Sequence, residues 1–137
     1  MMNRRIVLVD DDVDYLNALG AALSGKAEVI AFDNVVDALV YLKKNGEGVD
    51  LICVDLFMPD VEGVDWQLSG LSTINAIRAL YPENPPLIGV LSGMDAVVHI
   101  HTCLKNGADW FIEKRFDVES VAAQLVEKPL LLNTVDS

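Results

Sequence analysis

Short apolar runs alternate along the chain with segments in which apolar residues recur every three to four positions. The apolar runs occupy residues 6–9, 29–32, 51–54, 87–91 and 110–112. Runs of this length that are rich in β-branched residues are typical of strands, and an unbroken run such as 6–9 indicates burial on both faces. The pattern therefore predicts five strands.

The segments between and after these runs have the spacing of amphipathic helices. The residues at this spacing are, in order, Tyr15, Leu16, Leu19 and Leu23; Val35, Val36, Leu39 and Leu42, the expected inner face of the second helix; Ile74, Ile77 and Leu80; Val97, Val98, Ile100, His101 and Leu104; and Val118, Val121, Ala122 and Leu125. Asn34 and Asp117 are suited to cap the second and the last helix. Gly or Pro residues that end helices follow at Gly25, Asn45–Gly46, Pro82, Asn106–Gly107 and Pro129.

A strand followed by a helix is thus repeated five times, which predicts an α/β fold. Such alternation implies a doubly wound parallel sheet, (βα)5, with right-handed crossovers and helices on both faces. The 137 residues fit one compact domain. We expect this domain to span residues 1–129 and residues 130–137 to form a C-terminal tail.

The charge and the cysteines narrow the class of protein. The chain has 21 acidic and 10 basic residues and a formal net charge of −11, which argues against direct nucleic-acid binding because phosphate contacts need clustered Lys and Arg. No apolar run approaches the roughly 18 residues of a membrane span, and no cleavable signal pattern opens the chain. Cys53 and Cys103 form no CxxC pair, which predicts reduced core thiols and a cytoplasmic location.

Polar residues follow four of the predicted strands. Asp10-Asp11-Asp12, Asp55, Ser92-Gly93 and Lys114 come directly after the first, third, fourth and fifth strands. The carboxyl ends of parallel strands meet at one edge of a sheet, where such folds bind ligands. Two carboxylates about 4 Å apart repel by roughly 4 kcal/mol at an effective dielectric constant near 20. A hard divalent cation would relieve this repulsion, and Mg²⁺ suits carboxylates combined with a phosphate. The alternative for the aspartate triplet alone is a helix N-terminus that favours acidic residues.

Four motifs in order resemble the receiver domain of two-component response regulators. They are Val9-Asp10-Asp11-Asp12; Asp55-Leu56-Phe57-Met58-Pro59 with Gly63; Leu91-Ser92-Gly93; and the stretch from Gly107 to Lys114. The resemblance covers residues 5–125. It implies a flavodoxin-like fold with strand order 2-1-3-4-5.

The resemblance also implies a role for each residue of the acidic edge. Asp55 corresponds to the phosphoacceptor, which takes a phosphoryl group from a sensor histidine kinase or phosphotransfer protein. Asp10, Asp11 and Asp55, with the backbone carbonyl of Phe57, correspond to the Mg²⁺ ligands, and Asp12 corresponds to a position that is not usually a ligand. Ser92 and Lys114 correspond to the residues that contact the phosphoryl group.

The resemblance also gives roles to the aromatic pair of the fifth strand. Phe111 matches an aromatic that changes rotamer on activation, and ordinary packing is an equal alternative. Trp110 should point to the opposite face of its strand, in a structural role.

The chain departs from the family pattern at three places. Arg115 follows Lys114 where the family usually has a cis-proline; a cis bond to a non-proline costs about 3 kcal/mol, so we expect a trans bond and a different path. The third helix should start only after Gly70, which leaves an extra stretch at 64–70 that either extends the helix or contacts a partner through Trp66. Phe57 and Met94 are large apolar residues that flank the water path in the family, which predicts slow self-dephosphorylation.

These observations favour a receiver whose phosphorylation switches a protein-interaction surface. It would not be a conventional enzyme, since it would only promote its own phosphorylation and slow dephosphorylation. Its expected partners are a sensor histidine kinase or phosphotransfer protein and a downstream output protein or missing output domain, and a homodimer is left open. Arg115 and the long loop motivate the alternative, a degenerate module that signals without phosphorylation. A phosphohydrolase is disfavoured because Phe57 stands where a second Asp is expected, and a flavodoxin because three aspartates would repel a phosphate.

Overall fold

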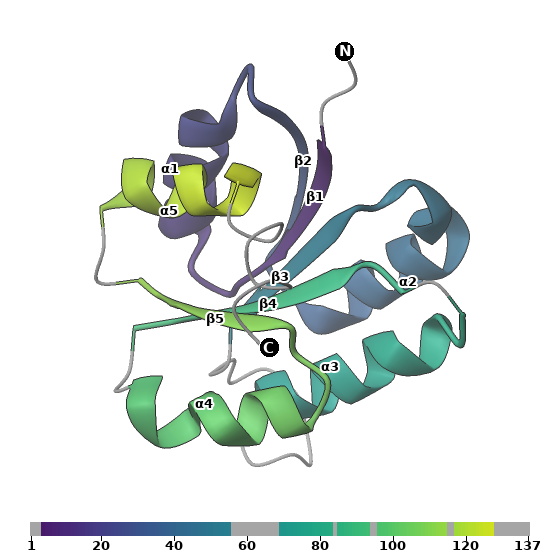
Figure 1. The fold of residues 1–137 in the computed structure, drawn as a ribbon. Helices are drawn as coiled ribbons and strands as arrows, with labels where there is room; N and C mark the ends of the chain where they lie inside the picture. The colour runs from purple at the N-terminus through teal and green to yellow at the C-terminus, as the bar shows by residue number, and fades with distance from the viewer. Residues whose placement is uncertain (1–3, 56–68, 84, 94–95, 115–116, 128–137) are drawn as a thin grey trace.

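The computed structural model describes residues 4–55, 69–83, 85–93, 96–114 and 117–127, apart from the side chains of residues 69–70 and 96–99. Strands and helices alternate through these residues (Figure 1). The strands are β1 (Arg4–Val9), β2 (Ala27–Phe32), β3 (Leu51–Asp55), β4 (Leu87–Ser92) and β5 (Trp110–Glu113). The helices are α1 (Val13–Leu23), α2 (Val35–Asn45), α3 (Ser69–Leu80), α4 (Ala96–Lys105) and α5 (Val118–Glu127), with a short 3-10 helix η1 at Gly46–Gly48. The alternation predicted from the sequence is confirmed.

The strands form one parallel sheet in the order β2-β1-β3-β4-β5, as the resemblance implied. The strand β1, which is first in the sequence, therefore lies inside the sheet, between β2 and β3. The register pairs Val9 with Val54 and Ser92 with Glu113, so the ends of β1, β3, β4 and β5 reach the same edge. This registration brings together the polar residues that follow these strands.

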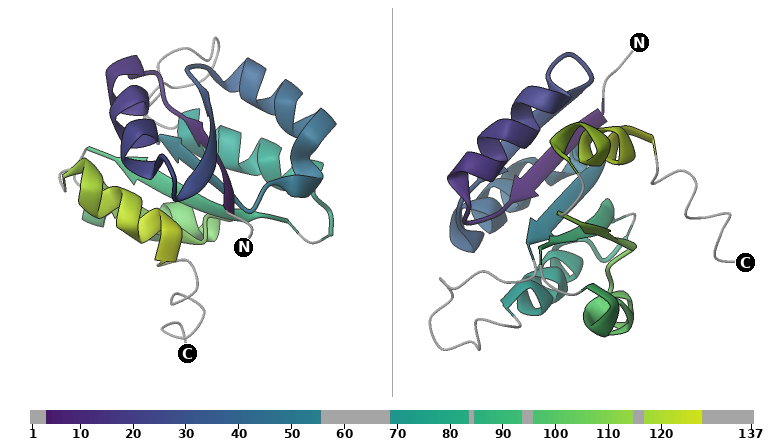
Figure 2. Two further views of the ribbon diagram at one scale, coloured as in Figure 1. Left: turned by 90° about the horizontal axis from the view of Figure 1, so that it is seen from above. Right: turned by 90° about the vertical axis from the view of Figure 1, so that its left-hand side faces the viewer.

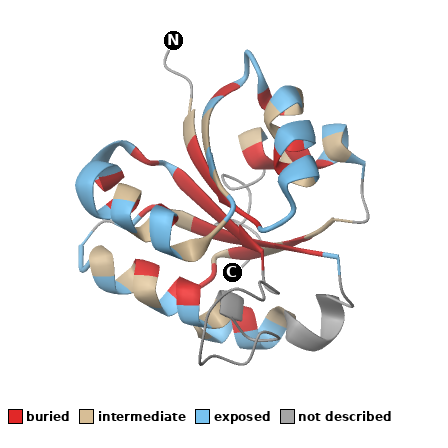
Figure 3. Ribbon diagram, turned by 180° about the vertical axis from the view of Figure 1, so that it is seen from behind, coloured by how far each residue is buried: buried red, intermediate tan, exposed pale blue. Residues whose placement is uncertain are grey.

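Two helical layers cover the sheet (Figure 2). On one face α1 and α5 pack over a core that includes Leu8, Leu19 and Leu125. On the other face α2, α3 and α4 pack over a second core that includes Ile52 and Ile77. The central strand β3 is buried along its whole length, and the helices expose their outer sides (Figure 3). Burial on both faces accounts for the continuous apolar runs in the sequence.

Several helix boundaries follow from local chemistry. The side chains of Asn34 and Asp117 accept hydrogen bonds from the backbone N–H groups of Asp37 and Ser120, so both predicted caps are confirmed. Gly25, just after α1, has a φ of 81°, a conformation that glycine adopts without steric cost. The helix α3 begins at Ser69, slightly earlier than the expected start after Gly70.

The inner face predicted for the second helix was partly wrong. In α2, Val36 is 70% exposed, while Ala38 takes the buried position. In α4, the residue that the structure buries is Cys103, whereas His101 and Leu104, which only marked the helix by their spacing, are exposed. A helix turn that contacts the sheet through a small residue leaves a neighbouring valine or leucine in solvent, and apolarity alone did not distinguish them.

The strand β5 places its two aromatic residues on opposite faces. Trp110 is buried in the core under α1 and α5, and Phe111 packs partly buried against the core under α2, α3 and α4. Gly89 of β4 lies beside the indole, where a Cβ atom would come within 2.7 Å of the Trp110 ring. Glycine is therefore needed at position 89 so that the indole can cross the sheet surface.

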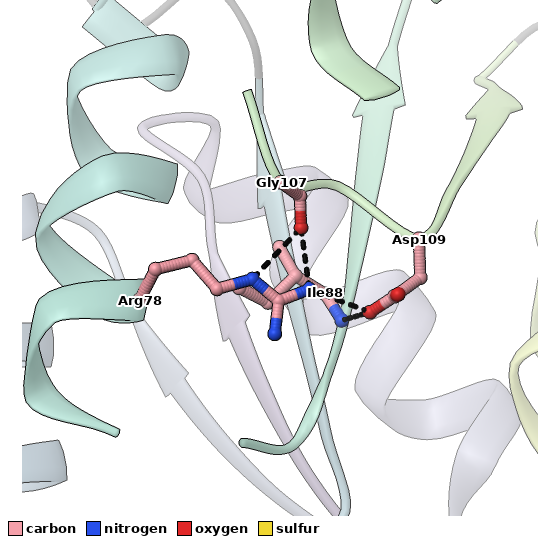
Figure 4. A network of polar contacts seen from close by, with 4 residues as sticks. All are labelled: Arg78, Ile88, Gly107 and Asp109. Carbon is pink, nitrogen blue, oxygen red and sulfur yellow. Dashed lines mark hydrogen bonds and ion pairs between the residues drawn. The ribbon is translucent and has the colours of Figure 1, made fainter. Parts of the chain in front are cut away.

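A polar network ties the opposite, amino-terminal edge of the sheet to α3 (Figure 4). Arg78 of α3 donates hydrogen bonds to the carbonyl of Gly107 and pairs with the Asp109 carboxylate at 3.0 Å. The same carboxylate accepts a hydrogen bond from the backbone N–H of Ile88. The network fixes the turn between α4 and β5, whose Gly107 has a φ of 110°.

The state of the two thiols and the lengths of the helices can be compared with what the sequence predicted. Cys53 and Cys103 are free and buried, as predicted, and burial raises the pKa of both thiols. Within the described ranges, none of the helices has the length and apolar character that a membrane crossing requires.

Candidate functional site

Three carboxylates gather at the carboxyl edge of the sheet. Asp10 follows β1, Asp11 comes next in the chain, and Asp55 is the last residue of β3. Each offers one carboxylate oxygen, and the three atoms lie within 4.8 Å of one another. Because β1 and β3 are neighbours, the strand order alone brings residues 45 positions apart into this cluster.

The backbone around the cluster is well anchored. The N–H of Asp10 donates to the carbonyl of Phe32 at the end of β2, and Asp10 Oδ1 accepts the N–H of Asp12 at 2.9 Å. Asp10 and Asp55 are only 2% and 7% exposed, whereas Asp11 is exposed. The cluster therefore has two buried acids at its base and one exposed acid at its rim.

Lys114 brings a positive charge to the pocket from β5. Its Nζ lies 2.5 Å from Asp10 Oδ2 and 3.7 Å from Asp55 Oδ2. Its backbone N–H donates to the carbonyl of Ser92, which fixes the start of the side chain at the end of β4. Ser92 itself is fully buried at that strand end. The polar ends of four strands thus meet around Asp55.

The electrostatics of the pocket favour a cation. The pKa of Asp11 is raised above its ordinary value of 3.8, first by burial and then by the negative charge of Asp10. Its contacts with its own backbone, with Asp55 and with Lys114 oppose this rise. One ammonium therefore only partly compensates three carboxylates, and a hard divalent cation with oxygen ligands would complete the balance.

The cluster dimensions fit Mg²⁺ with a small adjustment. Oxygen ligands on opposite sides of an octahedral Mg²⁺ ion lie about 4.2 Å apart. A mutual distance of up to 4.8 Å is slightly wider. Binding would draw the carboxylates inward or place a water molecule between one of them and the ion, which Mg²⁺ commonly retains.

Asp12 starts a helix, which was one of the two roles that the sequence left open for the aspartate triplet. It is the N-cap of α1, and its carboxylate accepts the N–H of Tyr15 at 3.0 Å. The helix-start interpretation of the aspartate triplet is thus correct for Asp12, and the cluster interpretation applies to Asp10 and Asp11.

The contact between Tyr15 and Lys114 was not predicted from the sequence. The Lys114 Nζ lies 4.7 Å from the centroid of the Tyr15 ring, in the geometry of a cation–π interaction. Tyr15 was assigned to the inner face of α1, and it does pack against that core. Its place one turn after the cap residue Asp12 is the signal that could have directed attention to the pocket.

Several predicted features lie outside the described residues. They are the carbonyl of Phe57, the Lys114–Arg115 peptide bond, the stretch at 64–68 with Trp66, the water path between Phe57 and Met94, and the whole tail at 130–137 together with Pro129. They stay predictions.

Solved structures of other proteins have the same fold. Among solved structures, a receiver domain protein (CheY-like) from Methanospirillum hungatei has a TM-score of 0.76 at 21% identity, covering 96% of this chain and 98% of its own. The receiver domain of NtrX from Brucella abortus has a TM-score of 0.75 at 24% identity, covering 92% and 98% of the two chains. These likenesses show the CheY-like, flavodoxin-type receiver fold.

Sequence comparisons give the family. The family described as "Response regulator receiver domain" matches residues 6–126. The two-component response regulator ORR1 of Oryza sativa is 30% identical over 126 residues, which is 85% of this chain and 52% of that protein. The transcriptional regulatory protein TrcR of Mycobacterium tuberculosis is 30% identical over 123 residues, 88% of this chain and 43% of that protein. The chain belongs to the response regulator receiver domain family, and it spans about half the length of the curated relatives it matches.

Proposed function

We propose that Asp55 accepts a phosphoryl group from a sensor histidine kinase or phosphotransfer protein, with Mg²⁺ as cofactor. The observation that carries this proposal is the meeting of Asp10, Asp11 and Asp55, with ligand atoms within 4.8 Å of one another, beside the Lys114 ammonium. Phosphoryl transfer depends on positioning and on compensating the charge of the phosphoryl oxygens, and this edge of the sheet offers both.

Each residue of the pocket has a distinct part in the reaction. A carboxylate oxygen of Asp55 attacks the phosphorus atom; an O–P bond forms as the N–P bond to the kinase histidine breaks, and the leaving imidazole takes a proton from solvent. Lys114 neutralises one phosphoryl oxygen and the Ser92 hydroxyl donates to another. Asp10, Asp11, Asp55 and the carbonyl of Phe57 would hold Mg²⁺, which would supply positive charge to the transferring group.

Phosphorylation then acts as a switch. The aspartyl phosphate adds negative charge beside Lys114 and Ser92, which shifts the balance between two conformations by its differential contacts with them. Receiver domains act on output domains or proteins through surfaces that differ between the two conformations. We propose that this chain does so in the cytoplasm. Its own activity would be limited to promoting its phosphorylation and slow dephosphorylation.

The alternative is a receiver-like module that signals without phosphorylation. Arg115, in place of the family's proline, favours it. The contact of Lys114 with both Asp10 and Asp55 opposes it, because a module that had lost the chemistry would not need a buried acidic cluster with a matched ammonium.

Intact mass spectrometry after incubation with acetyl phosphate and Mg²⁺ separates the two. We expect the wild-type chain to gain the mass of one phosphoryl group, and Asp55→Ala or a chelator to prevent the gain. Asp14→Asn, which removes an exposed acid of α1 outside the cluster, should leave the gain intact. A wild-type chain that stays unmodified while remaining folded would support the degenerate module.

A further inference from the structure

The ammonium of Lys114 is held from two directions. Asp10 Oδ2 lies 2.5 Å from Nζ, and the centroid of the Tyr15 ring lies 4.7 Å from it. Tyr15 belongs to the first turns of α1 and Lys114 directly follows β5, so segments distant in the sequence meet at this point. The lysine therefore lies between a carboxylate and an aromatic face.

The surroundings make the aromatic contact effective. The Lys114 side chain is only 17% exposed, and attraction between an ammonium and a ring strengthens as both lose water. A lysine stem has four flexible carbons and many rotamers, so a lysine facing several carboxylates has no single preferred position. The ring face limits these positions to the pocket side that Asp10 and Asp55 share.

The hydroxyl group of Tyr15 does not fix the position of its ring. Tyr15 Oη is buried and has no hydrogen-bond partner among the described residues, whereas the ring packs against the core under α1 and α5. Burial, followed by the negative charge of Asp10, raises the pKa of Tyr15 to about 12, so the side chain stays neutral at physiological pH. The ring, rather than the oxygen, carries the contact with Lys114.

We propose that Tyr15 is a positioning residue, whose ring face holds the Lys114 ammonium where it meets a phosphoryl group on Asp55. This inference rests on the proposed function of the pocket. The chain has Arg115 after the lysine in place of a proline that would stiffen the loop. An aromatic contact from α1 then supplies the restraint on the lysine.

A double-mutant cycle tests whether Tyr15 acts through Lys114. The rate of mass gain from acetyl phosphate at saturating Mg²⁺ is measured for Tyr15→Phe, Tyr15→Leu, Lys114→Gln and the double variant Tyr15→Leu/Lys114→Gln. We expect Tyr15→Phe to keep the wild-type rate and Tyr15→Leu to slow it about fivefold. In the Lys114→Gln background, Tyr15→Leu should have no further effect. Equal slowing in both backgrounds, or equal slowing by Phe and Leu, would overturn the proposal.

If the wild-type chain does not accept a phosphoryl group, the proposed function is wrong, but the positioning role of Tyr15 can still be tested by a second measurement. The ε-methylene protons of Lys114 should show ring-current shifts in the NMR spectrum of the wild type and of Tyr15→Phe. Tyr15→Leu should remove these shifts, while the control Tyr41→Leu, on the α2 side where Tyr41 contacts Phe32, should leave them unchanged. Lys114 shifts that do not respond to Tyr15→Leu in a folded protein would refute the positioning role.

Discussion

The Lys114 ammonium lies 2.5 Å from Asp10 Oδ2, so the residue after β5 neutralises an acid at the end of β1, on the other side of β3 and β4. The Asp10 side chain is 3% exposed, which means that water contributes little to its charge balance. This pair couples the stability of the fold to the chemistry of the pocket, because either a cation or a proton must replace the lysine if it is removed.

Removing the lysine charge should therefore destabilise the protein in a way that Mg²⁺ reverses. In a chelator, Lys114→Gln should lower the free energy of unfolding by about 3 kcal/mol, since a buried carboxylate loses its partner. Urea unfolding with and without Mg²⁺ measures this loss and its recovery. Lys105→Gln, at the exposed end of α4, is the matched control and should change little. A loss that Mg²⁺ does not reduce would contradict the account.

Removing one acid from the rim should have the opposite effect. Asp11→Asn should raise the free energy of unfolding by about 1 kcal/mol in a chelator. The charge of Asp10 opposes that of Asp11, and two like charges about 4 Å apart repel by this amount even at the dielectric constant of water. The same substitution should weaken stabilisation by Mg²⁺. Thermal unfolding with increasing Mg²⁺ measures both effects, and an unchanged response to Mg²⁺ would remove Asp11 from the cluster.

The stability difference between Asp11→Asn and the wild type should depend on pH, because the pKa of Asp11 is raised in the wild type. The folded protein holds the Asp11 proton more tightly than the unfolded chain, whose pKa is near the ordinary value of 3.8. The protonated Asp11 carboxyl therefore contributes to the free energy of unfolding. This contribution is complete below a pH of 3.8 and is lost as pH rises through the raised pKa of the folded state. The advantage of Asp11→Asn over wild type should therefore be small in acid and grow towards neutral pH. Melting temperatures of both proteins across this range test the sign.

The close approach of Gly89 to Trp110 predicts that even one methyl group is costly there. Gly89→Ala should lower the free energy of unfolding by about 2 kcal/mol, because its Cβ would meet the indole at 2.7 Å in a packed core. Gly20→Ala in α1 is the matched control: nothing lies within 4 Å of its added Cβ. That control should stabilise the helix by about 0.5–1 kcal/mol. Urea unfolding compares the two, and equal effects would show that the indole yields easily.

Phe57, two residues after Asp55, and Met94, two residues after Ser92, predict a long-lived phosphoryl group. Phe57 and Met94, by the family resemblance, flank the path of the hydrolytic water and cannot orient it. Replacing both with polar residues such as Asn should shorten the phosphoryl lifetime about tenfold, within the range of positioned proton-transfer groups. Intact mass followed over time after removal of the phosphodonor gives the lifetime. A wild-type lifetime as short as that of the polar variant would contradict the prediction.

The alternating apolar pattern was enough to predict the five strands and five helices, because each element carries its own period and its own ending residues. The strand order came from the family resemblance, since alternation alone does not say which strands are neighbours. Asp10, Asp55, Ser92 and Lys114 could be placed at one edge because parallel strands end together. That inference needed only topology.

Side-chain relationships across elements were harder to predict. The exposure of Val36 and the burial of Ala38 depend on how α2 turns over the sheet, which the apolar period leaves uncertain by about one residue. The Tyr15–Lys114 contact and the Arg78–Asp109 pair each join residues from separate elements, with no motif to mark them. Such contacts are set by the packing of the whole domain, after local structure is already fixed.

Under the proposed function, Asp55 carries the phosphoryl group. Peptide mapping after acetyl phosphate and Mg²⁺ treatment, followed by borohydride reduction of the acyl phosphate, tests it most directly. The account predicts that reduction converts residue 55, and no other acid, to homoserine. Conversion at Asp10 or Asp11, or none at any residue of a folded chain, would contradict it.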